Sequence, residues 1–243
     1  MILRDEIMNF KYATNTSNID EPDVHLIGVF SDLKIDEKNN FLSKNSLSKI
    51  RNVMKKCNFS GNIGDHRTFD NTGSQIQIIL FGLGEKRKFG PIILKNALTS
   101  ITKKILKTNM QSLSINVDNL IERKSEESSL ELIITTMHAS KYKYNYKSKP
   151  DTYKLKICNI ISRIKLTSSK FSQILKTSKS ISNGISLAKE LGNTPPNICN
   201  PTFLANTVKK LKKEFPSLKI KILEEAEMKK HGMGAFLSVS RGS

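Results

Sequence analysis

The sequence contains few cysteines and no long apolar run. Its three cysteines, Cys57, Cys158 and Cys199, are far apart and form no Cys-x-x-Cys pair, which predicts reduced thiols rather than disulfides. No run of about 18 apolar residues is present, so we expect no membrane span. Residues 1–6 carry acidic side chains and open no apolar segment, so we also expect no secretory signal. Together these features predict a cytoplasmic protein.

Acidic side chains are scarce in the second part of the chain. The formal net charge is +18, and residues 141–243 hold 21 Lys and Arg against six Asp and Glu. Such asymmetry can mark a surface that contacts nucleic acid. Only seven of the 40 basic residues are Arg, however, and Asn and Ile are abundant. A codon bias towards AT-rich codons explains this composition equally simply, and we favour it.

Strand-like and helix-like patterns alternate through the first 190 residues. Apolar or alternating runs predict strands at residues 7–13, 24–30, 75–81, 112–117 and 153–161. Apolar residues at helical spacing predict helices at residues 43–57, 91–106, 128–142 and 167–191. This order is typical of an α/β fold, with a mixed sheet flanked by helices. The last helix is long and basic, and we expect it to link two domains.

A second domain is expected to begin after the last of these helices. Gly192 and the Pro195-Pro196 pair interrupt regular structure. Beyond them the pattern predicts a helix at 201–214, a strand at 218–223, a helix at 225–231 and a strand at 235–240. These elements are too few to enclose a core, and both strands would be unpaired sheet edges. We therefore divide the chain into an N-terminal domain (1–165), a linker helix (166–192) and a truncated second domain (193–243), which we expect to be mobile or aggregation-prone.

Histidines and acidic residues in the sequence give little sign of a metal or catalytic site. His25 lies within an apolar strand, where a structural role is favoured, and His66 and His138 have no partner at metal-ligand spacing. His231 has Glu227 one helical turn before it, but Gly232 follows, which favours a helix C-terminus. Asp65 and His66 lack an accompanying nucleophile.

Three further motifs have a simple structural interpretation. Cys199 is better explained as a buried small residue than as a nucleophile. Residues 82–84, Gly-Leu-Gly, follow a strand but lack the third glycine of a dinucleotide loop, so a turn is favoured. Glu224, Glu225 and Glu227 lie at a helix start, where acidic residues favour capping over catalysis. We therefore assign no catalytic, substrate-binding or metal-binding residue to this chain.

Several segments resemble the leucyl (cytosol) aminopeptidase family. Residues 190–201, Glu-Leu-Gly-Asn-Thr-Pro-Pro-Asn-Ile-Cys-Asn-Pro, resemble the opening of that family's catalytic domain. Residues 223–239 resemble its next helix-turn-strand unit, and residues 241–243 resemble the turn that closes that unit. Residues 78–85 and 182–191 resemble a central strand of the N-terminal domain and the linker helix. The resemblance spans the whole chain but roughly the first half of a family member.

The resemblance implies a hydrolase, a metalloprotease that removes N-terminal amino acids from peptides. Family members are cytoplasmic homo-hexamers that use two divalent metal ions, manganese or zinc, to activate water and polarise the peptide carbonyl. The motifs that hold those ions lie downstream of the residues present here. The resemblance therefore implies that this chain binds no metal and is inactive alone.

The basic stretch at residues 141–189 supports an alternative function. It holds 12 Lys and Arg and one acidic residue, and tyrosines interleave with lysines near its start. Lys with aromatic side chains can bind nucleic acid without sequence preference. Some bacterial members of the resembled family also bind DNA. A solvated helix face is the simpler interpretation, and we favour it over a non-specific nucleic-acid-binding module.

Overall fold

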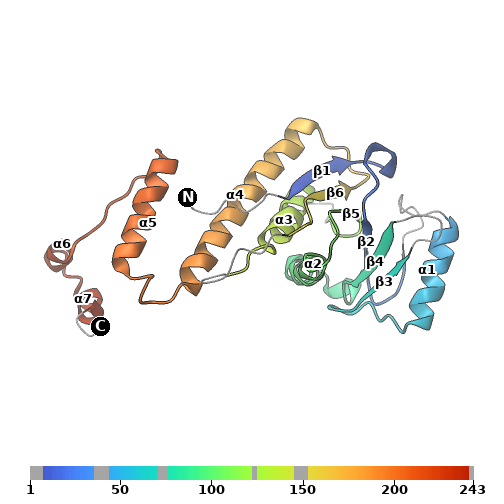
Figure 1. The fold of residues 1–243 in the computed structure, drawn as a ribbon, viewed down its shortest axis with the longest axis horizontal. Helices are drawn as coiled ribbons and strands as arrows, with labels where there is room; N and C mark the ends of the chain where they lie inside the picture. Colours follow the sequence, from blue (N-terminus) through green and yellow to red (C-terminus); the bar gives the residue numbers. More distant parts are fainter. Residues whose placement is uncertain (1–7, 36–43, 71–75, 122–124, 145–152, 241–243) are drawn as a thin grey trace. The chain divides into compact units, whose positions relative to one another are not determined.

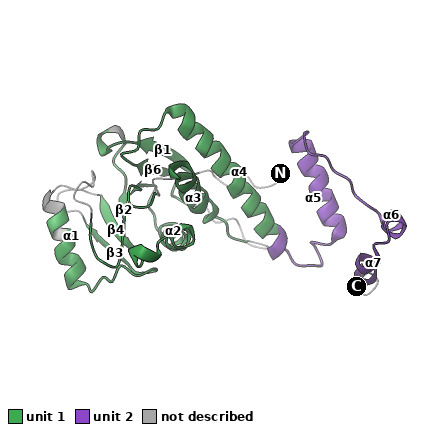
Figure 2. Cartoon of the chain, turned by 180° about the vertical axis from the view of Figure 1, so that it is seen from behind, with its two compact units in different colours: residues 1–190 green, residues 191–243 purple. Residues whose placement is uncertain are grey.

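The computed structural model describes residues 8–35, 44–70, 76–121, 125–144 and 153–240. The contacts within the chain divide it into two compact units, residues 1–190 (unit 1) and residues 191–243 (unit 2) (Figure 2). The division predicted from the sequence, at residues 165 and 192, stays a prediction. Ends of several predicted elements, and residues 241–243 of the family resemblance, lie outside the described residues.

Unit 1 contains a mixed six-stranded sheet with the strand order β1-β6-β5-β2-β4-β3 (Figure 1). The strands are β1 (Asn9–Ala13), β2 (Val24–Val29), β3 (His66–Asp70), β4 (Gln77–Gly82), β5 (Ser112–Asn116) and β6 (Ile157–Ile161). All neighbours are parallel except β3, which pairs antiparallel with β4 at one edge. The mixed α/β fold predicted from the sequence is thus confirmed.

Helices cover both faces of this sheet (Figure 1). They are α1 (Lys44–Lys56), α2 (Pro91–Ile105), α3 (Glu126–Ala139) and α4 (Ser168–Asn193). One apolar core lies between the sheet and α2, α3 and α4, and a smaller one lies under α1. Successive side chains of β4 point to opposite faces of the sheet and so contribute to both cores. Ile79 and Phe81 lie in the first core, and Ile78 and Leu80 lie in the second.

The structure confirms every helix predicted in unit 1 and adds one strand, β3. Its residues, His-Arg-Thr-Phe-Asp, show no apolar run and are half-buried or exposed. An edge strand packs one side at most against the core, so it carries little hydrophobic signal. The sequence pattern also placed the start of the last strand at residue 153, whereas β6 begins at Ile157.

The described residues of unit 2 form three helices: α5 (Pro201–Glu214), α6 (Glu225–Lys230) and α7 (Gly234–Ser240). Asn200 caps α5, because its side-chain oxygen accepts a hydrogen bond from the amide of Phe203 at 2.9 Å. The two strands predicted here are wrong. Residues 218–223 form no regular element, and residues 235–240 lie within α7. A strand needs a neighbour to pair its backbone, whereas a helix satisfies its own; the described part of unit 2 offers no such neighbour.

Candidate functional site

His25 is a structural residue, as its apolar surroundings predict. It lies on β2, is 5% exposed, and its Nδ1 shares a hydrogen bond with the hydroxyl of Ser114 on the neighbouring strand β5. Burial lowers the pKa of His25 to about 4. The ring is therefore neutral at physiological pH and sits within the sheet rather than in a cavity.

The other three histidines lie in separate environments. His138 is buried near the end of α3, and His66 on β3 lies beside Lys104 of α2, with Nζ 2.8 Å from Nδ1. His231 follows α6, and its amide bonds the carbonyl of Glu227 at 3.0 Å. Gly232 then takes a left-handed conformation with φ +69°, so the predicted helix C-terminus is confirmed.

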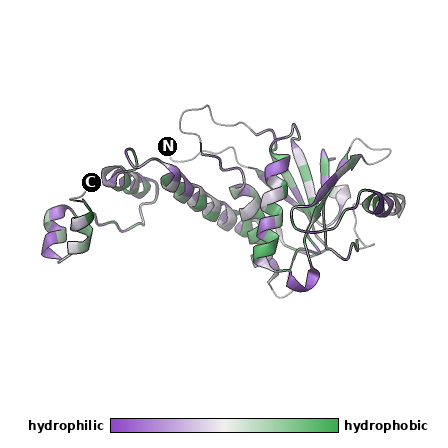
Figure 3. Ribbon diagram, turned by 90° about the horizontal axis from the view of Figure 1, so that it is seen from below, coloured by the Kyte–Doolittle hydropathy of each residue, from purple (hydrophilic) through white to green (hydrophobic). Residues whose placement is uncertain are grey.

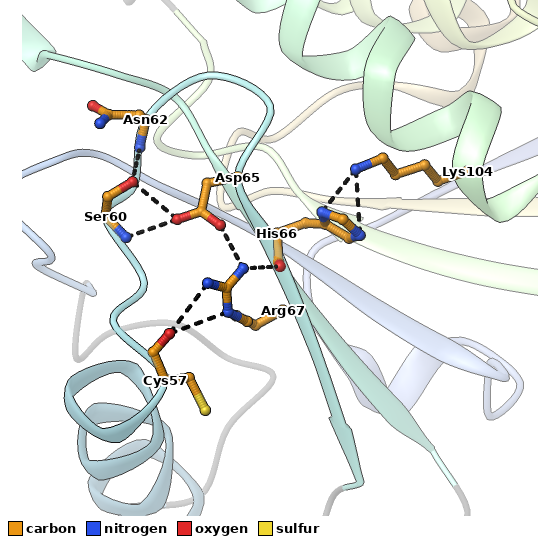
Figure 4. Close-up of polar contacts among 7 residues, drawn as sticks. All are labelled: Cys57, Ser60, Asn62, Asp65, His66, Arg67 and Lys104. Atoms are coloured by element: carbon orange, nitrogen blue, oxygen red, sulfur yellow. Dashed lines mark hydrogen bonds and ion pairs between the residues drawn. The ribbon is translucent and has the colours of Figure 1, made fainter.

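Asp65 is the centre of a hydrogen-bonded loop next to β3 (Figure 4). One carboxylate oxygen accepts bonds from the amide and hydroxyl of Ser60 at 2.7 and 2.9 Å, and the other accepts from Arg67 at 2.6 Å. Arg67 also donates to the carbonyl of Cys57. These hydrogen bonds and the Arg67 charge outweigh desolvation, which by itself raises the pKa, and leave the pKa of Asp65 below its usual value. All its partners are internal, so the network fixes a loop.

The Gly82-Leu83-Gly84 segment is a tight crossing of backbones. A Cβ at Gly82 would come within 1.9 Å of the carbonyl oxygen of Asn62, and the amide of Gly84 bonds the carbonyl of Gly61 at 2.8 Å. Gly84 has φ +73°, which favours glycine. The backbone itself fills the space that a phosphate loop would leave open. Gly82 ends β4 and residues 83–84 have no regular structure, so the predicted turn stays a prediction.

The structure differs from the sequence prediction in the burial of Cys199, and it shows how the acidic cluster lies at the start of α6. Cys199 is half-buried rather than buried, while Cys158 is fully buried in the sheet and burial raises its thiol pKa. Glu224 occupies the N-cap of α6, and Glu225 and Glu227 lie in the first turn, as predicted. The Glu224 side chain makes no capping hydrogen bond, so the contribution of this cluster is electrostatic.

At the start of the basic stretch, the aromatic side chain of Tyr142 contacts residues of α4. Lys141 is 7% exposed. The Tyr142 hydroxyl donates to Glu190 at 3.0 Å, and the Lys189 ammonium lies 5.5 Å from the centre of the Tyr142 ring. Residues 145–152 of the stretch lie outside the described residues. Within the described part, Tyr142 is thus held against the end of α4.

A cleft of about 450 Å³ lies between α2, α3 and α4, and sequence reasoning missed it. Its walls combine apolar side chains, hydroxyls and lysines. One signal was present in the sequence: Lys95, Thr99 and Lys103 recur every four residues and share one face of α2. Their convergence with α3 and α4 depends on how the helices cross, which no local pattern specifies.

Metal ligands do not cluster in the part of the chain that the structure describes. Within those residues, no group of three or more His, Cys, Asp or Glu side chains could hold a metal ion. No described helix is both long enough and apolar enough to cross a bilayer.

Sequence models of one protein family match two segments of the chain. The N-terminal domain of the cytosol aminopeptidase family matches residues 26–150, and the catalytic domain of the same family matches residues 186–243. A probable cytosol aminopeptidase of Nitrosococcus oceani is 31% identical over 245 aligned residues, which cover 97% of this chain and 48% of that protein. The chain thus spans about half the length of this curated relative.

Solved structures show the same fold. A mutant of tomato leucine aminopeptidase aligns with a TM-score of 0.76 at 19% identity, covering 92% of this chain and 46% of that one. The bottromycin maturation enzyme BotP in complex with Mn aligns with a TM-score of 0.56 at 13% identity, covering 79% of this chain and 36% of that one. Because the N-terminal model matches more than half of this chain, the chain belongs to the cytosol aminopeptidase family.

Proposed function

We propose that this chain forms the N-terminal portion of a metallo-aminopeptidase that removes N-terminal amino acids from peptides. The observation that supports this most strongly is that one chain matches the models of both family domains, the N-terminal one at residues 26–150 and the catalytic one at residues 186–243. The relative from Nitrosococcus oceani carries the name of the same activity. In this proposal the whole enzyme acts in the cytoplasm as a homo-hexamer.

The proposed enzyme uses two divalent metal ions, manganese or zinc, to activate water and polarise the scissile carbonyl. BotP, a structural neighbour, has been solved with Mn. The described residues of this chain do not fit such a centre, because none of their His, Cys, Asp and Glu side chains gather in threes. We propose that the ligands belong to the part of the catalytic domain that residues 186–243 do not represent, and that this chain alone is inactive.

The contribution of this chain is then structural. Unit 1 is a folded α/β layer with its own cores. α4 begins within unit 1 and ends at Asn193, after the catalytic-domain match has begun at residue 186. α4 is therefore the element through which the two family domains are joined. Its buried serines lie against α3, which fixes the helix to unit 1.

A chimera tests the proposal. Residues 1–243 are fused, at the aligned position, to the remaining half of the Nitrosococcus oceani relative. With added Mn²⁺ the chimera is expected to hydrolyse Leu-p-nitroanilide but not its N-acetylated form, because an exopeptidase requires the free amine. Residues 1–243 alone are the matched control and are expected to show no turnover. A folded chimera without activity, or turnover by the control, would contradict the proposal.

The nucleic-acid alternative stays a prediction. No described contact favours it, and Tyr142, one of the tyrosines of the basic stretch, is bonded to Glu190. Gel-shift titration at low and high salt tests it, because any binding through lysines must weaken as salt rises.

A further inference from the structure

The cleft between α2, α3 and α4 has an apolar lining and a rim of exposed lysines. Leu132 and Ala139 on α3 and Ile181 and Ile185 on α4 are its apolar lining residues. Three lysines complete the lining: Lys95 and Lys103 from α2 and Lys189 from α4. All three are exposed, so their ammonium groups surround the opening while their stems add to the apolar wall. Glu131 is the one carboxylate among the lining residues.

Lys103 and Lys95 repel the positive charge of Lys189. The pKa of Lys189 is lowered by partial burial and then by the charges of Lys103 and Lys95. The Tyr142 ring lies 5.5 Å from the same ammonium and holds it near the cleft. A bound anion would offset this repulsion and favour the charged form of each ammonium.

We propose that this cleft binds a small organic carboxylate with an apolar body. The volume, about 450 Å³, falls in the range of small-molecule sites. The isoleucines and Leu132 would take the apolar body, while the lysine ammonium groups would bind the carboxylate. Inorganic anions lack the body and alcohols lack the charge, so both would bind more weakly. The proposal is independent of the peptidase activity proposed above.

Isothermal titration calorimetry on the 243-residue chain tests the site with octanoate, which carries both features. Octanol and acetate are the matched probes that each carry one, and both are expected to bind at least about tenfold more weakly than octanoate. N-acetyl-leucine distinguishes a peptide-derived carboxylate from a lipid-derived one. Binding of either carboxylate supports the proposal, and binding of neither overturns it.

Methyl NMR locates the bound probe. In a chain labelled at isoleucine methyl groups, octanoate is expected to shift Ile181 and Ile185 and to leave Ile220 and Ile222 of unit 2 unchanged. Shifts confined to unit 2 would mean that the probe binds exposed apolar surface there, and would overturn the proposal.

Lysine variants test the rim. Lys189→Met and Lys103→Met keep apolar stems and are each expected to weaken octanoate binding about tenfold. Lys107→Met, an exposed lysine just beyond α2 that does not line the cleft, is the control and should bind like the parent chain. Equal affinity of Lys189→Met and the parent overturns the proposal. Lys95→Met, at the third lysine that lines the cleft, gives a second measurement if another lysine variant misfolds.

Discussion

His25 couples the stability of unit 1 to pH. Its pKa is about 4 in the folded chain and about 6.5 when exposed. Between these values the unfolded chain binds a proton that the folded chain does not, so stability falls as the pH falls from about 6.5 to 4. The loss is about 1.4 kcal/mol per pH unit, or about 3 kcal/mol in total. Above pH 6.5 this group contributes no pH dependence.

Urea unfolding at several pH values measures the coupling. The His25→Gln variant removes the titrating group. Asp65, whose lowered pKa also reduces stability in acid, acts equally in both proteins. The difference between the two stability curves therefore reports His25. We expect it to change by about 3 kcal/mol between pH 7 and pH 4. Parallel curves would show that the ring is not held neutral by burial.

Two threonines, one in the last turn of α2 and one just beyond it, differ in whether their hydroxyls have partners. Thr102 is fully buried and its hydroxyl has no partner among the described residues. Thr108 donates to the carbonyl of Ile105 at 2.7 Å and accepts from the amide of Met110. Thr102→Val is expected to stabilise the chain by about 1 kcal/mol, and Thr108→Val to destabilise it by about 1 kcal/mol. Denaturant titration measures both, and changes of the same sign would contradict this account.

At the scale of elements, α4 is held against α3 by small side chains. Ser178, Ser182 and Ser186 recur every four residues and are all buried. The hydroxyl of Ser182 bonds the carbonyl of Ser178 and reaches the carbonyl of Thr135 on α3 at 3.3 Å. Polar and apolar residues interleave along α4 (Figure 3). The face of α4 that packs on α3 is therefore marked in the sequence by small side chains rather than by apolar ones.

Replacing one of these serines tests the packing. Ser182→Leu inserts a large side chain where α4 meets α3 and is expected to destabilise unit 1 by about 2 kcal/mol. Ser180→Leu is the control, because Ser180 is exposed and bonds within its own helix. Thermal unfolding compares the two variants. Equal melting temperatures would show that α4 does not pack on α3 through this face.

The sequence predicts the elements of unit 1 well because their apolar residues repeat at the period of the buried face. α2 buries Leu94, Ala97, Leu98 and Ile101 at helical spacing, and Pro91 marks its start. The pattern fails where burial is slight: β3 lies at an edge, and residues 235–240 have the β-like run Ala-Phe-Leu-Ser-Val-Ser but no strand beside them. The cleft could not be predicted, because its residues converge only through the crossing of three helices.

At the scale of the whole molecule, the two units differ in how much apolar surface they bury. Seven of the ten large apolar side chains that the described residues expose belong to unit 2: Phe203, Leu204, Val208, Phe215, Leu218, Phe236 and Val239. Within the described part of unit 2, Thr207 and Leu237 are buried. The expectation that residues 193–243 are mobile stays a prediction, now supported by their small buried surface rather than by unpaired strands.

Hydrogen exchange compares the units directly. α2 and α5 are of similar length, but α2 buries six side chains and α5 buries one. Amides of α5 are therefore expected to exchange much faster than those of α2 in the same sample. Equal protection of the two helices would mean that unit 2 has a packed core, contrary to this account.

The central proposal is that this chain, a member of the cytosol aminopeptidase family, holds no two-metal centre of its own. Manganese content of the purified 243-residue chain, measured after metal removal, reloading and gel filtration, tests it most directly. The account predicts that no manganese is retained in stoichiometric amount. Two manganese ions held tightly by each chain would contradict it.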